Sequence, residues 1–355
     1  MTRQVRSWAI AALAVFALAG AALPCLPLGS VANAGIIEWV TVGDPGNTAD
    51  TAPAGHGAVA TSFQIMKYEF TNQQYTDFLN SVAATDTYSL YNTHMGSDAR
   101  GGITRSGSSG SYSYSAKTDM GDKPVNFVSW FDAARVSNWL MNGATSSSST
   151  ETGAYTLVSG QTSGTAPAVN SGATFYVPTE DQWYKAAYYK GGGTSAGYWN
   201  YATQSDSDPT AVTAGSTGIG SAGSSGNFAN FDYAADWNSL NGNVTTVGTN
   251  GGPSVYGAFD MSGNLNEWND HTGAAGSSRG VRGGDWTGLA FNVSSSFSVS
   301  DSPSFESSGL GFRLASPVPS GVPEIDPATG GSALSLVAGV LAMIEQRRRR
   351  ATLVA

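Results

Sequence analysis

The chain of 355 residues is acidic, with 26 Asp and Glu against 17 Lys and Arg and a formal net charge of −9 at pH 7. Six of the 17 basic residues, Arg3, Arg6 and residues 347–350, lie near the termini, so the part between them lacks the cation stripe on which binding of nucleic acid or anionic lipid rests. The only cysteine, Cys25, also lies near the N-terminus, which excludes disulfides and thiolate chemistry from the rest of the chain.

The N-terminal segment has the features of a secretory signal peptide. Arg3 and Arg6 precede an apolar run over residues 9–23, and Ala32 and Ala34 place small residues at both cleavage-determining positions. We therefore predict that residues 1–34 are a signal peptide and that the protein is exported. An uncleaved anchor is the alternative, although the run is short for a membrane span.

The central part, residues 35–318, is predicted to be one α+β domain with a high loop content. Capping-box patterns mark the starts of three helices at Thr71/Gln74, Ser129/Asp132 and Thr179/Gln182. Short alternating runs predict strands at residues 63–66, 175–177 and 311–314. Stretches rich in Ser, Gly and Thr predict surface insertions at residues 106–115, 145–152 and 205–226.

Residues 256–268 combine glycines, a tryptophan and carboxylates in a pattern that neither helix nor strand periodicity produces. Such a segment needs irregular backbone, and glycine supplies the positive φ angles that this backbone requires. Carboxylate oxygens and carbonyls released from regular hydrogen bonding can converge on a hard cation such as calcium. The segment is therefore a candidate metal site.

The C-terminal segment, residues 319–355, has the features of a sorting tail. An acidic proline motif at residues 323–327 is followed by a short apolar run over residues 330–344 and by four arginines at residues 347–350. This order resembles the PEP-CTERM signal of Gram-negative bacteria, which implies recognition by an exosortase. A plain membrane anchor is the alternative, because the run falls short of a comfortable span. Both interpretations of the tail predict that the protein lies in the cell envelope, on the outer surface or in the extracellular matrix. In both, only the tail contacts the membrane.

The central domain resembles the formylglycine-generating enzymes, or sulfatase-modifying factor domains, in six blocks that occur in the family's order. These blocks are residues 66–75, 124–133, 177–187, 257–268, 282–286 and 311–315. The resemblance spans about residues 36–316 and implies an irregular, loop-rich α+β fold distantly related to C-type lectins.

The resemblance implies the oxidoreductase chemistry of the active family members, but this chain lacks the residues that perform it in those members. Aerobic formylglycine-generating enzymes use two cysteine thiolates near the domain's C-terminal end to bind copper(I), but here the matching residues 291–301 carry serines. The related iron-dependent sulfoxide synthases need a histidine cluster, and the three histidines here, His56, His94 and His271, share no local motif. We therefore expect neither copper nor iron and predict no catalytic residue.

Calcium is the cofactor that the resemblance favours. By block matching, Asp260 and Glu267 would supply carboxylate oxygens, and Gly263 and Leu265 would supply main-chain carbonyls. A second family site would fall on Asn230 and Phe231, with partners within residues 237–243. The alternative for Glu267 is a hydrogen-bonded side chain that braces a turn without metal.

Large aromatic and basic side chains are expected to hold this loop-rich domain together. Five tryptophans in the family blocks are predicted to lie in the core: Trp130, Trp139, Trp183, Trp268 and Trp286. A second aromatic group either joins the core or is exposed and stacks on a sugar or peptide: Tyr188, Tyr189, Tyr198, Trp199 and Tyr201. Arg282 and Arg313 are predicted to pair with carboxylates such as Asp285.

Three functions follow as hypotheses. The first is a calcium-stabilised, non-catalytic surface domain that binds polysaccharide or protein or serves structurally. The second is an oxidoreductase of the formylglycine-generating or non-haem iron type that uses an unrecognised site. The third is another enzyme on the same scaffold, with acid-base groups among Asp260, Glu267, Asp270 and His271.

Overall fold

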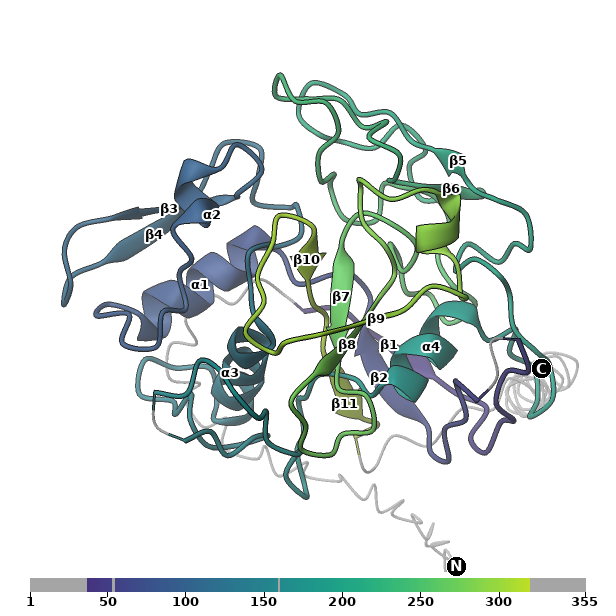
Figure 1. Cartoon of the computed structure of the whole chain (residues 1–355), viewed down its shortest axis with the longest axis horizontal. Coiled ribbons are helices and arrows are strands. Elements are labelled where there is room, and N and C mark those ends of the chain that lie inside the picture. Colours follow the sequence, from purple (N-terminus) through teal and green to yellow (C-terminus); the bar gives the residue numbers. More distant parts are fainter. Residues whose placement is uncertain (1–36, 53–54, 159, 320–355) are drawn as a thin grey trace, which may run out of the picture.

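The computed structural model describes residues 37–52, 55–158 and 160–319 of the chain. The predicted signal peptide and sorting tail lie outside these ranges, apart from residue 319. The described part is an α+β domain of short strands, few helices and long loops, as the sequence predicts (Figure 1). Within these ranges, no helix has both the length and the apolarity needed to cross a membrane.

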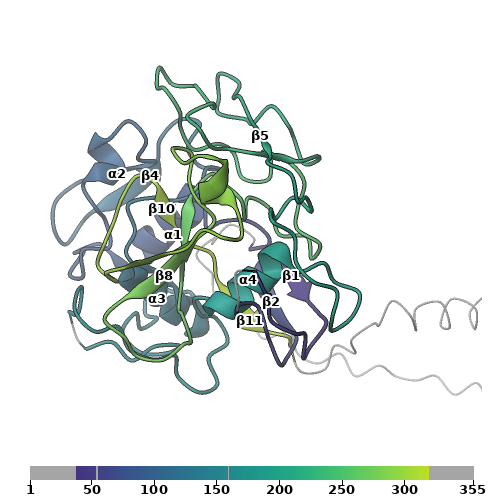
Figure 2. The same ribbon diagram turned by 45° about the vertical axis from the view of Figure 1, so that its right-hand side comes forward.

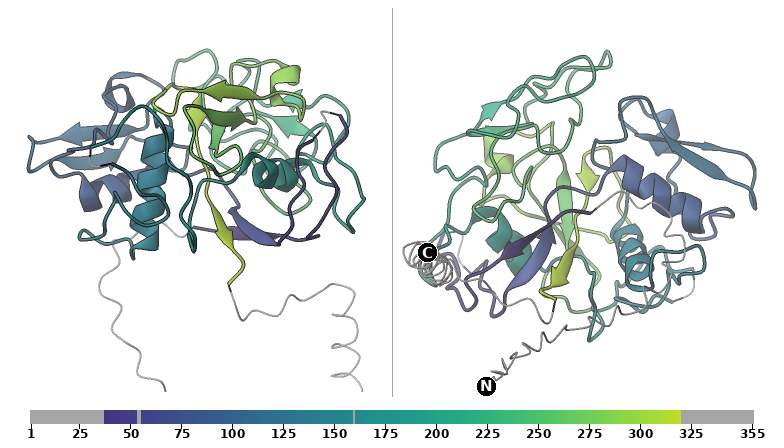
Figure 3. Two further views of the ribbon diagram at one scale, coloured as in Figure 1. Left: turned by 60° about the horizontal axis from the view of Figure 1, so that its bottom comes forward. Right: turned by 180° about the vertical axis from the view of Figure 1, so that it is seen from behind.

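One three-stranded sheet joins the two ends of the described domain. It has the order β1 (Trp39–Val42), β2 (Phe63–Met66) and β11 (Ala315–Pro317), and both outer strands run antiparallel to β2. The strand predicted at residues 63–66 is therefore confirmed. Because the first and last strands share this sheet, the two ends of the described domain lie on the same side of the molecule (Figure 3, left).

A four-stranded sheet occupies the centre of the domain (Figure 1). Its order is β10 (Leu310–Gly311), β7 (Asn266–Asn269), β8 (Arg279–Arg282) and β9 (Val299–Asp301). Strand β7 pairs in parallel with β10, which places Glu267 opposite Gly311, and antiparallel with β8, which places Glu267 opposite Arg282. The sheet thereby brings the last three family-like blocks of the sequence together.

All three predicted helices form, and each begins with the predicted capping box. Helix α1 (Asn72–Val82) follows Thr71, α3 (Trp130–Met141) follows Ser129, and α4 (Glu180–Tyr188) follows Thr179. In each case the cap side chain accepts from the backbone N–H three residues on, and that third residue's side chain accepts from the cap backbone N–H. Helix α4 lies beside the β1, β2 and β11 sheet (Figure 2).

The smaller elements are short and lie in the loop regions. Strands β3 (Ile103–Ser106) and β4 (Ser113–Ala116) form a hairpin, so the stretch predicted as a surface insertion at residues 106–115 ends in a strand. Strands β5 (Thr210–Ala211) and β6 (Phe228–Ala229) pair in parallel. A single helical turn α2 (His94–Ser97) and a 3₁₀ turn η1 (Ala290–Val293) complete the elements.

Two of the predicted strands are wrong in their extent. Residues 175–177 form no strand, since only Tyr176 makes a bridge, to Ala315. Residues 311–314 are divided: Gly311 ends β10, residues 312–314 belong to no strand, and β11 starts at Ala315. The apolar alternation there arises because Phe312 and Leu314 are both buried in the core of an irregular connection.

Tryptophans fill the interior as predicted. Trp130, Trp139, Trp183 and Trp268 are fully buried, and Trp286 is nearly so. The second aromatic group is mostly core too, since Tyr188, Tyr189 and Tyr201 are buried and only Tyr198 and Trp199 keep partial exposure. This group therefore does not form an exposed stacking platform.

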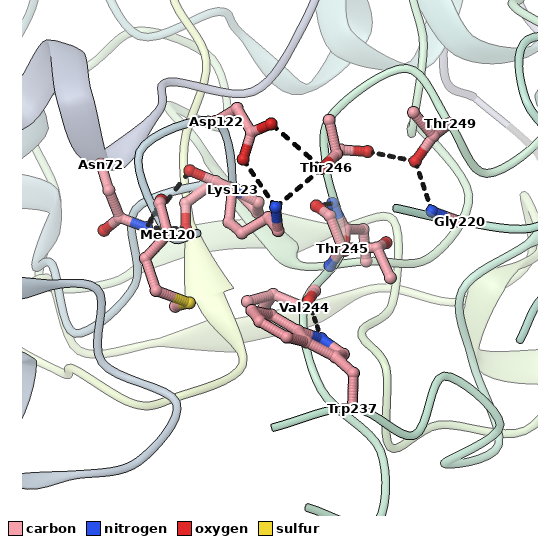
Figure 4. Close-up of polar contacts among 12 residues, drawn as sticks. Asn72, Met120, Asp122, Lys123, Gly220, Trp237, Val244, Thr245, Thr246 and Thr249 are labelled. Carbon is pink, nitrogen blue, oxygen red and sulfur yellow. Dashed lines mark hydrogen bonds and ion pairs between the residues drawn. The ribbon is translucent and has the colours of Figure 1, made fainter. Parts of the chain in front are cut away.

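A buried lysine fastens the long loops after α4 to the first half of the domain (Figure 4). The ammonium of Lys123 donates to the Asp122 carboxylate at 2.6 Å and to the Thr246 hydroxyl at 2.8 Å, and it lies over the ring of Trp237. Trp237 is itself held by a hydrogen bond to the Val244 carbonyl. Polar contacts therefore replace regular secondary structure in holding this region.

Candidate functional site

Glu267 and Arg313 form a fully buried ion pair in the centre of the domain. Arg313 donates from Nε to one carboxylate oxygen at 2.7 Å and from Nη2 to the other at 2.6 Å, and both side chains are 0% exposed. The indole N–H of Trp183 donates to the same carboxylate at 2.8 Å. Arg313 also donates to the carbonyls of Met66 and Phe259, so it ties β2 to the irregular segment that precedes β7.

Two further carboxylates, those of Glu69 and Asp260, lie in the electrostatic neighbourhood of this pair. Glu69 accepts from the Asn264 side chain at 2.7 Å and from the Leu265 N–H at 3.1 Å. Burial, reinforced by the charges of Asp260 and Glu267, raises the pKa of Glu69 well above its usual value. Ionisation of Glu69 is therefore disfavoured beside the Glu267 and Arg313 pair.

The four residues predicted as the first calcium site lie close along the chain, but their carboxylates already have partners. Asp260, which has φ +58°, accepts from the Gly248 N–H at 2.5 Å and from the Asn250 side chain at 2.9 Å. Glu267 is occupied by Arg313, as described above. The donor set of Asp260, Gly263, Leu265 and Glu267 thus does not present free carboxylates, and calcium there stays a prediction in which the ion would compete with a guanidinium.

The second predicted calcium site has a different character. Asn230 is fully buried, and its amide nitrogen donates to the Asn243 carbonyl at 2.8 Å, while its side-chain oxygen has no hydrogen-bond partner among the described residues. A buried oxygen of this kind fits a cation ligand, because leaving it unpaired costs about 1–3 kcal/mol. Phe231 follows directly in the chain and is nearly buried. The donor chemistry at Asn230 therefore fits calcium better than that around Glu267.

The histidines do not converge on one centre. His271 Nδ1 lies 3.5 Å and His56 Nδ1 3.9 Å from the carboxylate of Glu180, whereas His94 makes its contacts with Asn92 and Phe127. Glu180 is taken by Arg282, which donates to it at 2.8 and 2.7 Å. Burial opposes ionisation of Glu180, but His271, Arg282 and His56 together lower its pKa to about 2.

The side chains most often used to bind transition metals form no cluster here. Within residues 37–52, 55–158 and 160–319, no three His, Cys, Asp or Glu side chains gather so that they could hold a metal ion. Asp270, another candidate acid-base group, is buried against Arg279 at 2.6 Å and accepts from the Tyr155 hydroxyl at 3.0 Å. Each of these four candidate groups therefore has its own hydrogen-bond or ion-pair partners: Asp260, Glu267, Asp270 and His271.

A surface depression of about 340 Å³ lies at the edge of the central sheet, beside η1. Its volume falls at the lower end of the range of small-molecule sites, about 300–1,000 Å³. It is formed by the first residue of β7, by the loop that follows β8 and by the segment that contains η1. Its lining consists of Asn266, Gly284, Asp285, Thr287, Gly288, Leu289, Asn292 and Phe297.

A short hydrogen-bond network fixes the polar floor of this depression. Asp285 accepts from the Asn266 side chain at 2.9 Å with one oxygen, and from the Thr287 N–H at 2.9 Å and hydroxyl at 2.6 Å with the other. Asn292 accepts from the Leu289 N–H at 2.8 Å. A side chain at Gly284, which has φ +70°, would meet the Asn292 carbonyl at 2.4 Å, so glycine is needed for the loop to approach η1.

An apolar rim adjoins the polar floor. Leu289 is 63% exposed and Phe291 is 62% exposed. Phe297, which lines the depression, packs edge-on against Phe291 with ring centroids 6.1 Å apart. Exposed apolar side chains are informative when they gather beside a polar pocket, because they leave a surface that a ligand can cover.

Sequence reasoning missed this depression. Arg282 and Arg313 pair with carboxylates as predicted, but the partners are Glu180 and Glu267, so Asp285 as their partner is wrong. Asp285 is thereby left to organise the depression. The available signal was the run from Leu289 to Phe297, where apolar residues stand in a polar loop.

Comparisons with known proteins agree with this architecture. Residues 31–318 match the family described as sulfatase-modifying factor enzyme 1-like domain, and residues 322–352 match the VPEID-CTERM protein sorting domain. No curated protein matches the chain significantly.

Several solved structures resemble the chain at low sequence identity. The crystal structure of CarF is 21% identical, with coverage of 80% of this chain and 99% of that chain and a TM-score of 0.48. Treponema denticola variable protein 1 is 18% identical, with coverage of 79% and 95% and a TM-score of 0.46. PvdO from Pseudomonas aeruginosa is 17% identical, with coverage of 79% and 92% and a TM-score of 0.42.

The family match covers most of the chain and includes every element of the described fold. The sorting domain begins at residue 322, shortly after β11, where the sequence reads Val-Pro-Glu-Ile-Asp. A sorting domain of this kind implies processing by sorting machinery. The chain belongs to the sulfatase-modifying factor enzyme 1-like family and ends in a VPEID-CTERM sorting domain.

Proposed function

We propose that this protein is an exported surface module that binds a ligand without performing the copper-dependent cysteine oxidation of its family, and that calcium stabilises it. The observation that carries the proposal is the depression beside η1, which joins a fixed polar floor to an exposed apolar rim. Such a combination is typical of sites that orient a small ligand by a few polar groups.

The position of the depression suits presentation at a cell surface. In Figure 3 (left), η1 lies at the top of the domain, while β11, which leads to the sorting domain, lies at the bottom. A domain attached to the envelope at its β11 end, after processing by exosortase-type machinery, would carry the depression at its opposite end. This arrangement favours a polysaccharide or protein of the envelope or extracellular matrix as ligand.

The side chains around the depression also argue against thiol chemistry. Residues 291–301 match the region that carries the thiolates in the active enzymes, and the sequence has no cysteine after Cys25. A serine hydroxyl does not replace a thiolate as a copper(I) ligand. Ser294 and Ser295 are buried and their neighbours Asn292 and Phe297 line the depression, so this segment contributes its wall.

Calcium enters the proposal through Asn230 and Phe231. The unpartnered oxygen of Asn230 would serve as an amide ligand, and the main chain at Phe231 would add a carbonyl, which are the hard oxygens that calcium prefers. Calcium bound there would stabilise the folded state by mass action. The first predicted site, around Asp260 and Glu267, is retained in the proposal, with the competition from Arg313 noted above.

The test combines metal content, stability and turnover of the purified protein. We expect calcium in the metal analysis, and a melting temperature that falls on chelation and recovers when calcium is returned. Asn230→Ala should lose most of this calcium dependence, whereas Asn292→Ala, a matched change in the depression, should keep it. Bound copper or iron, or an aldehyde mass change in a sulfatase-motif peptide incubated with the protein, would establish the alternative of an oxidoreductase and refute the proposal.

A further inference from the structure

The chemistry of the depression narrows the class of ligand that it accepts. Asp285 is the one charged residue in its lining, and no Lys, Arg or His side chain lines it. An anionic ligand would bring a second negative charge next to this carboxylate with no cation to offset it. Recognition of carboxylate, sulfate or phosphate groups is therefore disfavoured.

The charge of Asp285 is already engaged, which also disfavours a strongly cationic ligand. Its two oxygens accept three hydrogen bonds from Asn266 and Thr287, so the carboxylate is oriented and its charge is partly delocalised into neutral donors. The lone pairs that remain suit hydroxyl donors. A hydroxyl is neutral and both gives and accepts a hydrogen bond, so it complements a carboxylate flanked by carboxamides.

The carboxamides extend the same pattern. Asn266 gives its N–H to Asp285, which fixes the orientation of the amide, and its side-chain oxygen has no hydrogen-bond partner among the described residues. Asn292 presents its amide nitrogen on the other wall while its oxygen is held by Leu289. The floor thus offers the oriented carboxylate of Asp285 as an acceptor and the amide of Asn292 as a donor, while the Asn266 oxygen is buried beneath them.

The rim supplies the apolar half of the recognition. Phe291 and Phe297 meet edge-on, and with Leu289 they form an exposed apolar wall beside the polar floor. Uncharged sugars have this dual character, since their C–H faces pack on aromatic rings and their hydroxyls bind planar polar groups. The depression has room for the end of a chain or a short stretch of it, in keeping with a volume of about 340 Å³.

We propose that the depression lined by Asn266, Asp285, Asn292, Leu289 and Phe297, with Phe291 packed against Phe297 at its rim, binds a neutral saccharide unit of a polysaccharide. This inference rests on the proposed function of a surface binding module and specifies its ligand class. Polar groups of the floor select hydroxyl geometry, and the aromatic rim provides contact area.

Titration calorimetry on the purified protein tests the inference with three probes. These are neutral cello-, malto- and manno-oligosaccharides, a uronic-acid oligosaccharide of equal length, and a lysine-rich peptide. We expect binding of at least one neutral series and none of the uronic-acid chain or the peptide. Phe291→Ala, which changes an exposed side chain and leaves the core intact, should weaken binding about tenfold. Phe305→Ala, at another exposed phenylalanine outside the lining, should leave it unchanged.

The outcomes separate this inference from the proposed function. Binding of the uronic-acid chain or the peptide alone, or neutral binding that Phe291→Ala and Asp285→Asn leave intact, would overturn the saccharide assignment while a binding module stands. Absence of binding to all three probes would also overturn it. The proposed function is judged independently, by the turnover and metal measurements.

Discussion

Replacing Arg313 by methionine tests the claim that the guanidinium of a buried ion pair neutralises Glu267. Methionine keeps much of the length and volume of the arginine stem, so the change removes the guanidinium with little loss of packing. Glu267 would then keep only the hydrogen bond from Trp183. We expect the variant to be far less stable than the wild type.

The magnitude follows from the burial of both partners. Each side chain is 0% exposed, and the guanidinium makes two hydrogen bonds to Glu267 and others to the carbonyls of Met66 and Phe259. Removing one member of a buried pair leaves an uncompensated charge, which costs about 3–5 kcal/mol. Asp260 lies in the same electrostatic neighbourhood, so its charge also loses a compensating cation.

Urea denaturation at neutral pH measures this loss, with two companions that sharpen it. Lys67→Met removes a cation that pairs with the exposed Glu38 at 2.9 Å, and it should cost only about 0–1 kcal/mol. Combining Glu267→Gln with Arg313→Met should cost less than the sum of the two single changes, because each residue chiefly compensates the other.

The reasoning fails if Arg313→Met costs no more than Lys67→Met. It also fails if two results occur together. Added calcium would restore the stability of the Arg313→Met variant to that of the wild type, and chelation would destabilise the wild type in a way that depends on Glu267. In that case a cation, and not the guanidinium, would be the natural partner of this carboxylate.

Three further predictions address other parts of the fold. Burial and the neighbouring Glu306 raise the pKa of Asp132 from 3.8 to about 8. Because the folded-state pKa exceeds the unfolded value, the contribution of Asp132 to folding stability is greatest below about pH 4 and declines as the pH rises towards 8. Asp132→Asn should flatten this decline in urea midpoints measured across that pH window. Gly263→Ala should lower the free energy of unfolding by about 1–3 kcal/mol or more in the same assay, because φ is +93° and a side chain would meet the Asn230 carbonyl at 2.4 Å. Gly172→Ala is the control and should cost less, since Gly172 also has a positive φ but has open space around it. Lys123→Met should lower the free energy of unfolding by about 1–3 kcal/mol, because two charge-assisted hydrogen bonds are lost. Hydrogen exchange should show faster opening of the loop around Thr246 in this variant. Unchanged exchange would contradict the role of Lys123 as an anchor.

Local chemistry made the helices predictable. The capping boxes at Thr71, Ser129 and Thr179 need only a side chain and a backbone N–H three residues apart, and each forms as predicted. The tryptophans were predictable for a similar reason, since large rings in a domain with little regular structure have to be buried.

Strand limits and ion-pair partners depend on distant contacts and were not predictable in the same way. Phe312 and Leu314 alternate as in a strand, yet they connect two different sheets. Arg282 and Arg313 each had several carboxylates within reach in the sequence, and only the fold selects Glu180 for one and Glu267 for the other. The predicted pairing of Asp285 failed for this reason. The depression that Asp285 organises was therefore missed as well.

The assignment of the arginines also bears on how the proposed binding site is separated from the interactions that hold the fold. Arg282 and Arg313 satisfy Glu180 and Glu267 inside the domain, so the central sheet is held by interactions that need no thiolate and no transition metal. Asp285 is consequently free to organise the loop after β8, and this loop together with residues 291–297 builds the depression. The pairs that hold the sheet and the groups that line the depression share no side chain. The exposed residues Leu289 and Phe291 can therefore change in sequence with little effect on the fold, whereas Val293 is buried in the core. Changes at these exposed positions would alter the rim of the depression without disturbing the core, which is the reason to look for ligand specificity in this wall.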